Sequence, residues 1–180
     1  GYSYSDETVR RLAAMENAAP DFKIMWDNAY CVHHLTDTHD VILNMLEECR
    51  KAGHEDRALM FCSLSKVTFP GAGVAAMAAS RRNIDYILKN MFPMIISFDK
   101  LNQVRHIRFL KDMDGLAAHM EKHRALLEPK FRAVLAILDE GLSGCGSIAR
   151  WTKPNGGYFL SLYTLGGCAK RTVQLCREAG

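Results

Sequence analysis

The sequence predicts an α/β protein in which a mainly parallel sheet is sandwiched by helices, and three observations predict it. Apolar runs of strand length alternate with stretches of helical periodicity in the first half of the chain. The order strand, helix, strand favours parallel pairing, because a helix usually makes the crossover between parallel strands. Apolar residues make up 48% of the chain, which is ordinary for a globular protein that buries a sheet.

The first two elements are a helix and a strand. Ser5 is a favoured N-cap, and the acidic residues after it suit the start of a helix that should end before Pro20. Residues 22–26, Phe-Lys-Ile-Met-Trp, form a short and largely apolar run that is typical of a buried strand. This run stops at Asp27, so the carboxylate is expected just past the end of the strand.

A second helix and two more strands follow. Apolar residues recur at helical spacing over residues 42–49, and Gly53 is a natural C-cap. Residues 58–62 form a second apolar run that stops at Ser63, and the small residues of 73–79 predict a third strand. Ligands of open α/β sheets bind beyond the carboxyl ends of the strands. The segments that follow the first two strands are therefore expected to meet at one edge.

The second half of the chain is mainly helical and closes with a hairpin and a helix. Helical periodicity covers residues 82–91 and most of 102–142, where Pro129 is expected either to kink a helix or to start a new one. Two strand segments flank a turn at residues 154–157. A last helix is predicted over residues 169–178.

We place a domain boundary near Pro129. Residues 1–128 are then part of a large domain, and residues 129–180 are the start of a small C-terminal α+β domain. One hairpin and one helix bury little surface alone, so the second domain looks incomplete.

The composition excludes several classes of function. The 23 basic and 20 acidic residues are scattered, which argues against a nucleic-acid-binding stripe. No stretch approaches the roughly 20 apolar residues of a membrane span, and no signal peptide opens the chain. Six cysteines form no CxxC pair, which favours reduced thiols and a cytoplasmic setting. The spacing of His33, His34 and His39 beside Cys31 fits no closed four-ligand site, so no metal is expected.

Residues 63–66, Ser-Leu-Ser-Lys, place a lysine just after the second predicted strand. They match the S-x-x-K motif of penicillin-binding proteins, but the partner motifs S-D-N and K-T-G are absent from the sequence. Residues 71–76 match the dinucleotide pattern G-x-G-x-x-A, but Pro70 stands where a strand should precede it. A Schiff-base lysine is the third interpretation, because an amine can add to the aldehyde of pyridoxal phosphate.

A pyridoxal-phosphate site needs a carboxylate against the pyridine nitrogen, a hydroxyl near the ring oxygen, and hydrogen-bond donors around the phosphate. Asp27 ends a predicted strand and Tyr30 follows it, while Ser63 and Ser65 flank the turn before Lys66. Ordinary explanations stay open for each of them. Asp27 is also a common turn residue, the serines also satisfy backbone groups, and Lys66 is also compatible with an exposed loop.

The motifs "DNAY" at residues 27–30 and "SLSK" at residues 63–66, with Lys66 lying 36 residues after Tyr30, resemble the fold-type I pyridoxal-phosphate aminotransferases. "PNGGYF" at residues 154–159 resembles the P-x-G-G-x-F turn at the start of their small domain. The stretches "SKVTFPGAGVA", "NQVRHIRFLKD" and "WTKPNGGYF" are most similar to an aspartate-aminotransferase-like subgroup of class I/II. The resemblance covers essentially the whole chain, and it rests on the order and spacing of these motifs.

The resemblance implies a role for each candidate residue. Lys66 would be the catalytic residue, bind pyridoxal 5'-phosphate covalently and shuttle a proton to and from the substrate α-carbon. Asp27 would pair with the pyridinium nitrogen, and Tyr30 would hydrogen-bond the ring oxygen. Ser63 and Ser65 would hold the phosphate.

One feature of the family is missing from this sequence. Many relatives have a phosphate-binding arginine shortly after the lysine, whereas residues 71–74 read Gly-Ala-Gly-Val here. Arg105 is the candidate replacement, reaching the cofactor site of a partner subunit in a homodimer. A polar helix face made by Asn102, Arg105 and His106 is the competing interpretation.

The resemblance implies that the whole protein transfers an amino group between an amino acid, with aspartate or another dicarboxylic one favoured, and a 2-oxo acid. The sequence looks like an internal piece of a longer enzyme and is expected to be inactive alone. Two alternatives stay open. One is an aminotransferase-like domain that serves in regulation or dimerisation without catalysis. The other is a lyase or decarboxylase of the same fold, since these residues position the cofactor and do not select the bond that breaks.

Overall fold

The computed structural model describes residues 3–180, which form two compact units. The sheet unit comprises residues 3–32 and 41–120, and the hairpin unit comprises residues 33–40 and 121–180. The chain is α/β, as predicted. The predicted domains, which divide at Pro129, stay a prediction about the whole protein; the compact units divide between Met120 and Glu121.

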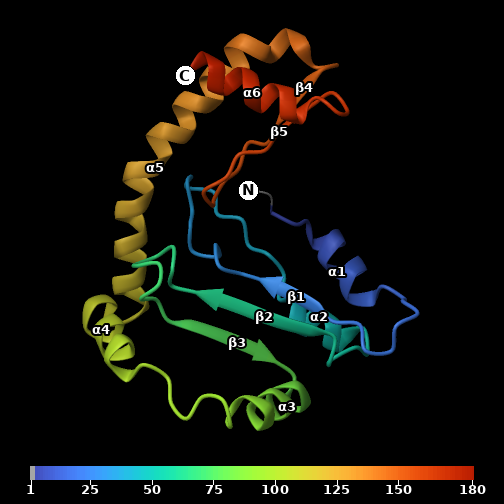
Figure 1. The fold of residues 1–180 in the computed structure, drawn as a ribbon, viewed down its shortest axis with the longest axis vertical. Helices are drawn as coiled ribbons and strands as arrows, with labels where there is room; N and C mark the ends of the chain where they lie inside the picture. Colours follow the sequence, from blue (N-terminus) through green and yellow to red (C-terminus); the bar gives the residue numbers. More distant parts are fainter. Residues whose placement is uncertain (1–2) are drawn as a thin grey trace. The chain divides into compact units, whose positions relative to one another are not determined.

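The sheet unit is built on three strands, β1 (Ile24–Asp27), β2 (Ala58–Ser63) and β3 (Ala75–Ala79), which lie side by side in Figure 1. β1 and β2 pair in parallel, and β2 and β3 pair antiparallel. These strands form a mixed sheet, so the expectation of a mainly parallel one is not confirmed. The connection between β2 and β3 contains no helix, which is the element that usually makes the crossover between parallel strands.

The core of the sheet unit lies on one face of the sheet. α1 (Asp6–Ala14) and α2 (Met45–Lys51) pack together there against the first two strands. Trp26 points into this core and is 8% exposed, whereas its neighbour Met25 is 74% exposed, because successive side chains of a strand point to opposite faces. The buried side chains of the core are Val9, Ala13, Trp26, Met45, Cys49 and Ala58.

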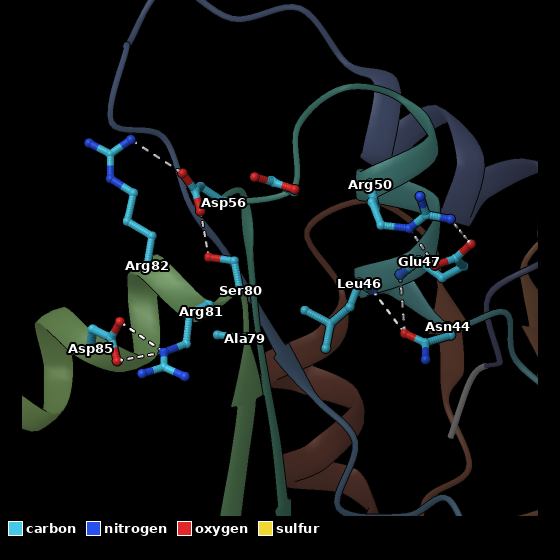
Figure 2. Close-up of a pocket in the computed structure, with 11 residues that line it drawn as sticks. Asn44, Leu46, Glu47, Arg50, Asp56, Ala79, Ser80, Arg81, Arg82 and Asp85 are labelled. Atoms are coloured by element: carbon cyan, nitrogen blue, oxygen red, sulfur yellow. Dashed lines mark hydrogen bonds and ion pairs between the residues drawn. The ribbon is translucent and has the colours of Figure 1, made fainter.

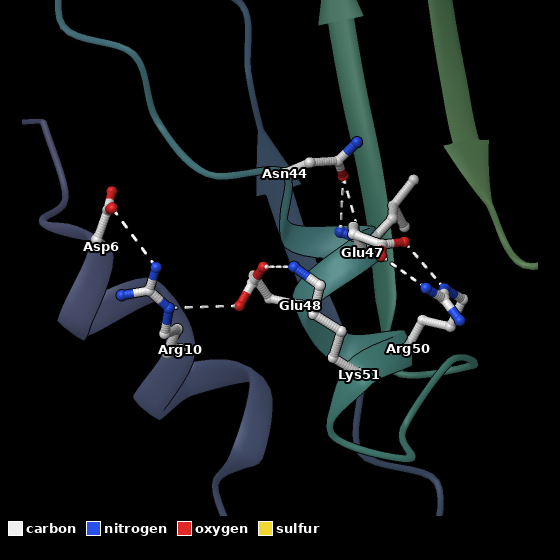
Figure 3. A network of polar contacts seen from close by, with 8 residues as sticks. Asp6, Arg10, Asn44, Glu47, Glu48, Arg50 and Lys51 are labelled. Carbon is white, nitrogen blue, oxygen red and sulfur yellow. Dashed lines mark hydrogen bonds and ion pairs between the residues drawn. The ribbon is translucent and has the colours of Figure 1, made fainter.

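Capping side chains set where the first two helices begin. Ser5 Oγ accepts a hydrogen bond from Thr8 N at 3.2 Å, so α1 begins at Asp6 as predicted. α2 begins later than the apolar pattern indicates, because Asn44 Oδ1 accepts hydrogen bonds from the first backbone N–H groups of the helix, as Figure 3 shows. An exposed cap thus overrides the apolar periodicity that starts near Ile42.

Charged side chains join α1 to α2 and to the sheet. Glu48, which is 8% exposed, contacts Arg10 of α1 at 3.6 Å and Lys51 at 2.7 Å (Figure 3). Arg57 is equally buried and donates hydrogen bonds to the carbonyl oxygens of Ala13 and Met15 at 2.7 and 2.8 Å. Arg57 therefore satisfies backbone acceptors at the C-terminal end of α1 that the helix itself leaves unpaired.

Three helices follow the sheet: α3 (Arg81–Met91), α4 (Lys100–Leu110) and α5 (Met113–Leu142). Pro129 lies inside α5, which continues through it as one helix. No helix in residues 3–180 combines the length and the apolar character that crossing a bilayer requires.

The hairpin unit contains β4 (Ala149–Trp151) and β5 (Leu162–Thr164), paired antiparallel, and α6 (Ala169–Ala179). A short 3-10 helix (Ser143–Cys145) precedes β4. The connection between the two strands is longer than the predicted turn, because its middle pairs with residues 33–35. Leu35 N donates to the Asn155 carbonyl and Gly157 N donates to the His33 carbonyl, both at 2.7 Å.

Candidate functional site

Asp27 is the last residue of β1 and stands opposite Phe61 of β2 in the parallel register. Asn28 N continues the ladder by donating to the Phe61 carbonyl at 2.7 Å, after which the chain turns. Asp27 Oδ1 accepts a hydrogen bond from Ala29 N at 3.1 Å, which fixes the carboxylate at the start of that turn. Tyr30 follows in the same turn and is half-buried.

Ser63 ends β2, one strand over from Asp27. Its Oγ accepts a hydrogen bond from Ser65 N at 3.1 Å and lies 2.7 Å from Ser65 Oγ. Residues 64–68, which we call the lysine turn, then form a single helical turn in which Val67 N and Thr68 N both donate to the Leu64 carbonyl at 2.9 Å. This turn carries the exposed side chain of Lys66.

The two predicted segments therefore lie at one edge of the sheet. β1 and β2 are parallel neighbours, so residues 27–30 and residues 63–66 both leave at the carboxyl ends of adjacent strands. Open α/β sheets bind their ligands at this edge. Five of the six candidate residues belong to these two segments; the sixth, Arg105, is exposed on α4.

Three residues that were not predicted as site residues contact the lysine turn or the segment that packs against it. His106 of α4 places Nε2 2.7 Å from Thr68 Oγ1, and Asn102 Nδ2 donates to the Gly73 carbonyl at 3.1 Å. His119, at the start of α5, donates from Nε2 to the Val67 carbonyl at 2.8 Å. The sequence signal for the first pair was the spacing of four between Asn102 and His106, which puts both on one helix face. His119 gave no comparable signal.

Arg105 lies next to this buried face but does not share it. Asn102 and His106 are 8% and 6% exposed, whereas Arg105 is exposed. The predicted polar helix face is thus divided, with Asn102 and His106 turned inward and the guanidinium turned outward.

Cys31 follows Tyr30 at this edge of the sheet. Desolvation raises the pKa of the Cys31 thiol above its ordinary value, and the neighbouring Cys62 raises it further. A thiol with a raised pKa stays protonated at neutral pH and is a poor nucleophile.

The histidines that follow belong to the hairpin unit. His33 is 3% exposed, and its ring meets the Tyr158 ring edge-on at 5.0 Å. The rings of His34 and His39 stack at 3.7 Å, and burial together with His39 lowers the pKa of His34. Within residues 3–180, no three His, Cys, Asp or Glu side chains are grouped so as to hold a metal ion.

A surface pocket of about 720 Å³ lies elsewhere in the sheet unit, between α2 and the start of α3 (Figure 2). Several polar side chains of the pocket pair with one another: Arg82 contacts Asp56 at 3.4 Å, and Ser80 Oγ donates to Asp56. Asp56 precedes β2 and Ser80 follows β3, so the pocket lies at the opposite end of β2 from Ser63. It is separate from the candidate site.

Comparison with known proteins identifies the family of the chain. The family model described as aspartate amino-transferase matches residues 1–180. The chain belongs to the aspartate aminotransferase family.

The chain is 48% identical over 180 residues to a protein of Mycolicibacterium smegmatis named as an aminotransferase. It is 42% identical to an aspartate aminotransferase of Corynebacterium glutamicum. The crystal structure of an aminotransferase from Corynebacterium diphtheriae matches 98% of this chain and 44% of its own, with 46% identity and a TM-score of 0.90. The chain spans 42% and 41% of the lengths of the two curated relatives.

Proposed function

We propose that the whole protein is a pyridoxal-phosphate-dependent aminotransferase. It exchanges an amino group between an amino acid, with aspartate or another dicarboxylic one favoured, and a 2-oxo acid. The observation that carries the proposal is the placement of the Asp27 turn and the lysine turn at the carboxyl ends of two adjacent parallel strands. The 42% identity with an aspartate aminotransferase supports the choice of substrate class.

The donor set fits this cofactor. Pyridoxal phosphate presents a basic ring nitrogen, a ring oxygen, an aldehyde and a phosphate, which call for an acid, a hydroxyl, an amine and several hydrogen-bond donors. Residues 27–30 supply the acid and the phenol, and residues 63–66 supply two hydroxyls and the amine. The Ser63 and Ser65 hydroxyls already lie 2.7 Å apart and hydrogen-bond to each other, so both hydroxyl groups lie at the same place on this edge.

When bound, pyridoxal phosphate supplies an electron-withdrawing ring that stabilises negative charge at the substrate α-carbon. Lys66 Nζ would hold the cofactor at its aldehyde carbon, with loss of water, and would accept the proton removed from the substrate α-carbon once the substrate amine has displaced it. Asp27 holds a proton on the ring nitrogen, and its contact with Ala29 N keeps the carboxylate oriented. Tyr30 donates a hydrogen bond to the ring oxygen, while Ser63 and Ser65 donate to the phosphate.

Arg105 and the apolar residues beside it support a homodimer. Leu101, Val104 and Ile107 of α4 are 80%, 44% and 65% exposed around the Arg105 guanidinium. Apolar area of this kind, concentrated on one helix, marks an interaction surface. A second copy that covers α4 brings Arg105 to the partner subunit, where the guanidinium supplies the positive charge for phosphate that residues 71–74 lack.

The test uses the full-length protein with added pyridoxal phosphate. We expect an absorbance band from the lysine-bound cofactor that Lys66→Ala abolishes and that an alanine substitution of the exposed Lys89 leaves intact. An unchanged band in Lys66→Ala would refute the assignment. Product analysis separates the alternatives, since an aminotransferase converts aspartate to its 2-oxo acid only with an acceptor oxo acid, whereas a decarboxylase releases carbon dioxide.

A further inference from the structure

We propose that His106 is a positioning residue for Lys66, acting through Thr68 on the backbone of the lysine turn. The inference rests on the proposed function, since it assigns a role toward the covalent lysine. His106 has no direct contact with the lysine side chain in this proposal. It sets where the turn that carries the lysine lies.

The contact between His106 and Thr68 closes the lysine turn. Thr68 N donates to the Leu64 carbonyl at 2.9 Å, and Thr68 Oγ1 lies 3.2 Å from the same oxygen. His106 Nε2 lies 2.7 Å from Thr68 Oγ1. The threonine thus joins the first residue of the turn to α4, and Lys66 lies between the joined residues.

The hydrogen-bond partners of the imidazole define its tautomer. Nδ1 lies 2.8 Å from the Asn102 carbonyl oxygen, which only accepts hydrogen bonds, so Nδ1 carries the proton. In the neutral ring, Nε2 is then the acceptor, and the single hydroxyl proton of Thr68 is shared between Nε2 at 2.7 Å and the Leu64 carbonyl oxygen at 3.2 Å. Because His106 is only 6% exposed, water offers little replacement for either bond.

The same face of α4 also holds the other side of the turn. Asn102 Nδ2 donates to the Gly73 carbonyl at 3.1 Å, and Gly73 packs directly behind Ser65. Leu64 N donates to the Val74 carbonyl at 2.8 Å, which fixes the start of the turn to the same strand segment. Asn102 thus supports the turn at Ser65, before Lys66, through Gly73. His106 supports it at Thr68, after Lys66.

This arrangement matters because Lys66 is exposed and is carried on the backbone of the lysine turn. The position of Nζ is then limited by the backbone that carries it. Misplacing a reacting group by about 1 Å can cost about 100-fold in rate. Loss of the contact between His106 and Thr68 is therefore expected to lower kcat while leaving KM nearly unchanged, because no substrate contact is removed.

Two substitutions distinguish the roles of the two ring nitrogen atoms of His106. His106→Gln keeps an acceptor at the reach of Nε2 toward Thr68, whereas His106→Asn keeps only a donor at the reach of Nδ1. In the full-length protein we expect His106→Asn to lower kcat about tenfold and to shift the pH midpoint of the absorbance band of the lysine-bound cofactor. His106→Gln should stay within about twofold of the wild type in kcat. Arg108→Gln, an exposed change on the same helix, is the matched control.

A second pair keeps the test decisive if His106→Asn fails to fold. Thr68→Val removes the hydroxyl at nearly constant shape and should reproduce the defect, whereas Thr68→Ser should retain wild-type kcat and pH midpoint. Equal kcat and equal midpoints across all four variants would overturn the inference while the band that depends on Lys66 persists. Loss of that dependence on Lys66 would instead overturn the proposed function.

Discussion

Gly73→Ala adds one methyl group directly behind Ser65. The added Cβ lies 3.1 Å from Ser65 N and 3.3 Å from Ser65 Oγ, whereas ordinary contacts begin near 3.4 Å. Two of the three nearest atoms are backbone atoms, so the clash is not relieved by turning a side chain. Ser65 must move by a few tenths of an ångström. We expect a cost of about 1 kcal/mol, at the lower end of the range for overpacking.

The cost is expected in cofactor affinity, because Ser65 is proposed to hold the phosphate. A loss of about 1 kcal/mol weakens binding about fivefold. Titration of the full-length variant with pyridoxal phosphate, followed by absorbance, measures the change in Kd. Gly144→Ala is the control, since a Cβ at Gly144 meets no atom within 4 Å. Wild-type affinity in the Gly73→Ala protein would refute the packing argument.

Three further predictions concern stability. Asn44→Ala removes the N-cap of α2 and should destabilise the fold by about 1 kcal/mol, while Asn44→Ser should restore most of this in thermal unfolding. Arg57→Met leaves two carbonyl acceptors at the end of α1 unpaired and should cost about 3 kcal/mol in urea unfolding; a loss below about 0.5 kcal/mol would contradict the contacts. The folded-state pKa of His34 is lowered, so its contribution to stability is complete above the unfolded value of about 6.5 and is lost as the pH falls below it. His34→Gln should therefore lose less stability than the wild type between pH 7.5 and about pH 5.5, and equal losses would contradict this.

Asp27 and Ser63 show how much of the fold a local sequence pattern predicts. A short apolar run that stops at a polar residue was enough to locate the ends of β1 and β2, because burial and strand length decide both features. The parallel direction of these strands then follows from the helix between them. The edge that carries Lys66 was therefore predictable from the sequence.

Other features depend on contacts that sequence periodicity does not contain. The antiparallel direction of β3 comes from a short connection around the lysine turn, which an apolar run over residues 75–79 does not encode. The pairing of Leu35 with Asn155 joins segments 120 residues apart. His119 shows the same limit, since its bond to the Val67 carbonyl depends on where α5 starts relative to the sheet. Each of these is a tertiary contact with no local signature.

The central claim is that Lys66 forms a covalent bond with pyridoxal phosphate, and borohydride reduction tests it most directly. Reduction of the full-length protein with bound cofactor makes that bond permanent, and peptide mass spectrometry then identifies the modified lysine. We predict a phosphopyridoxyl group on the peptide that contains Lys66. A label on any other lysine, with the Lys66 peptide unmodified, would contradict the account.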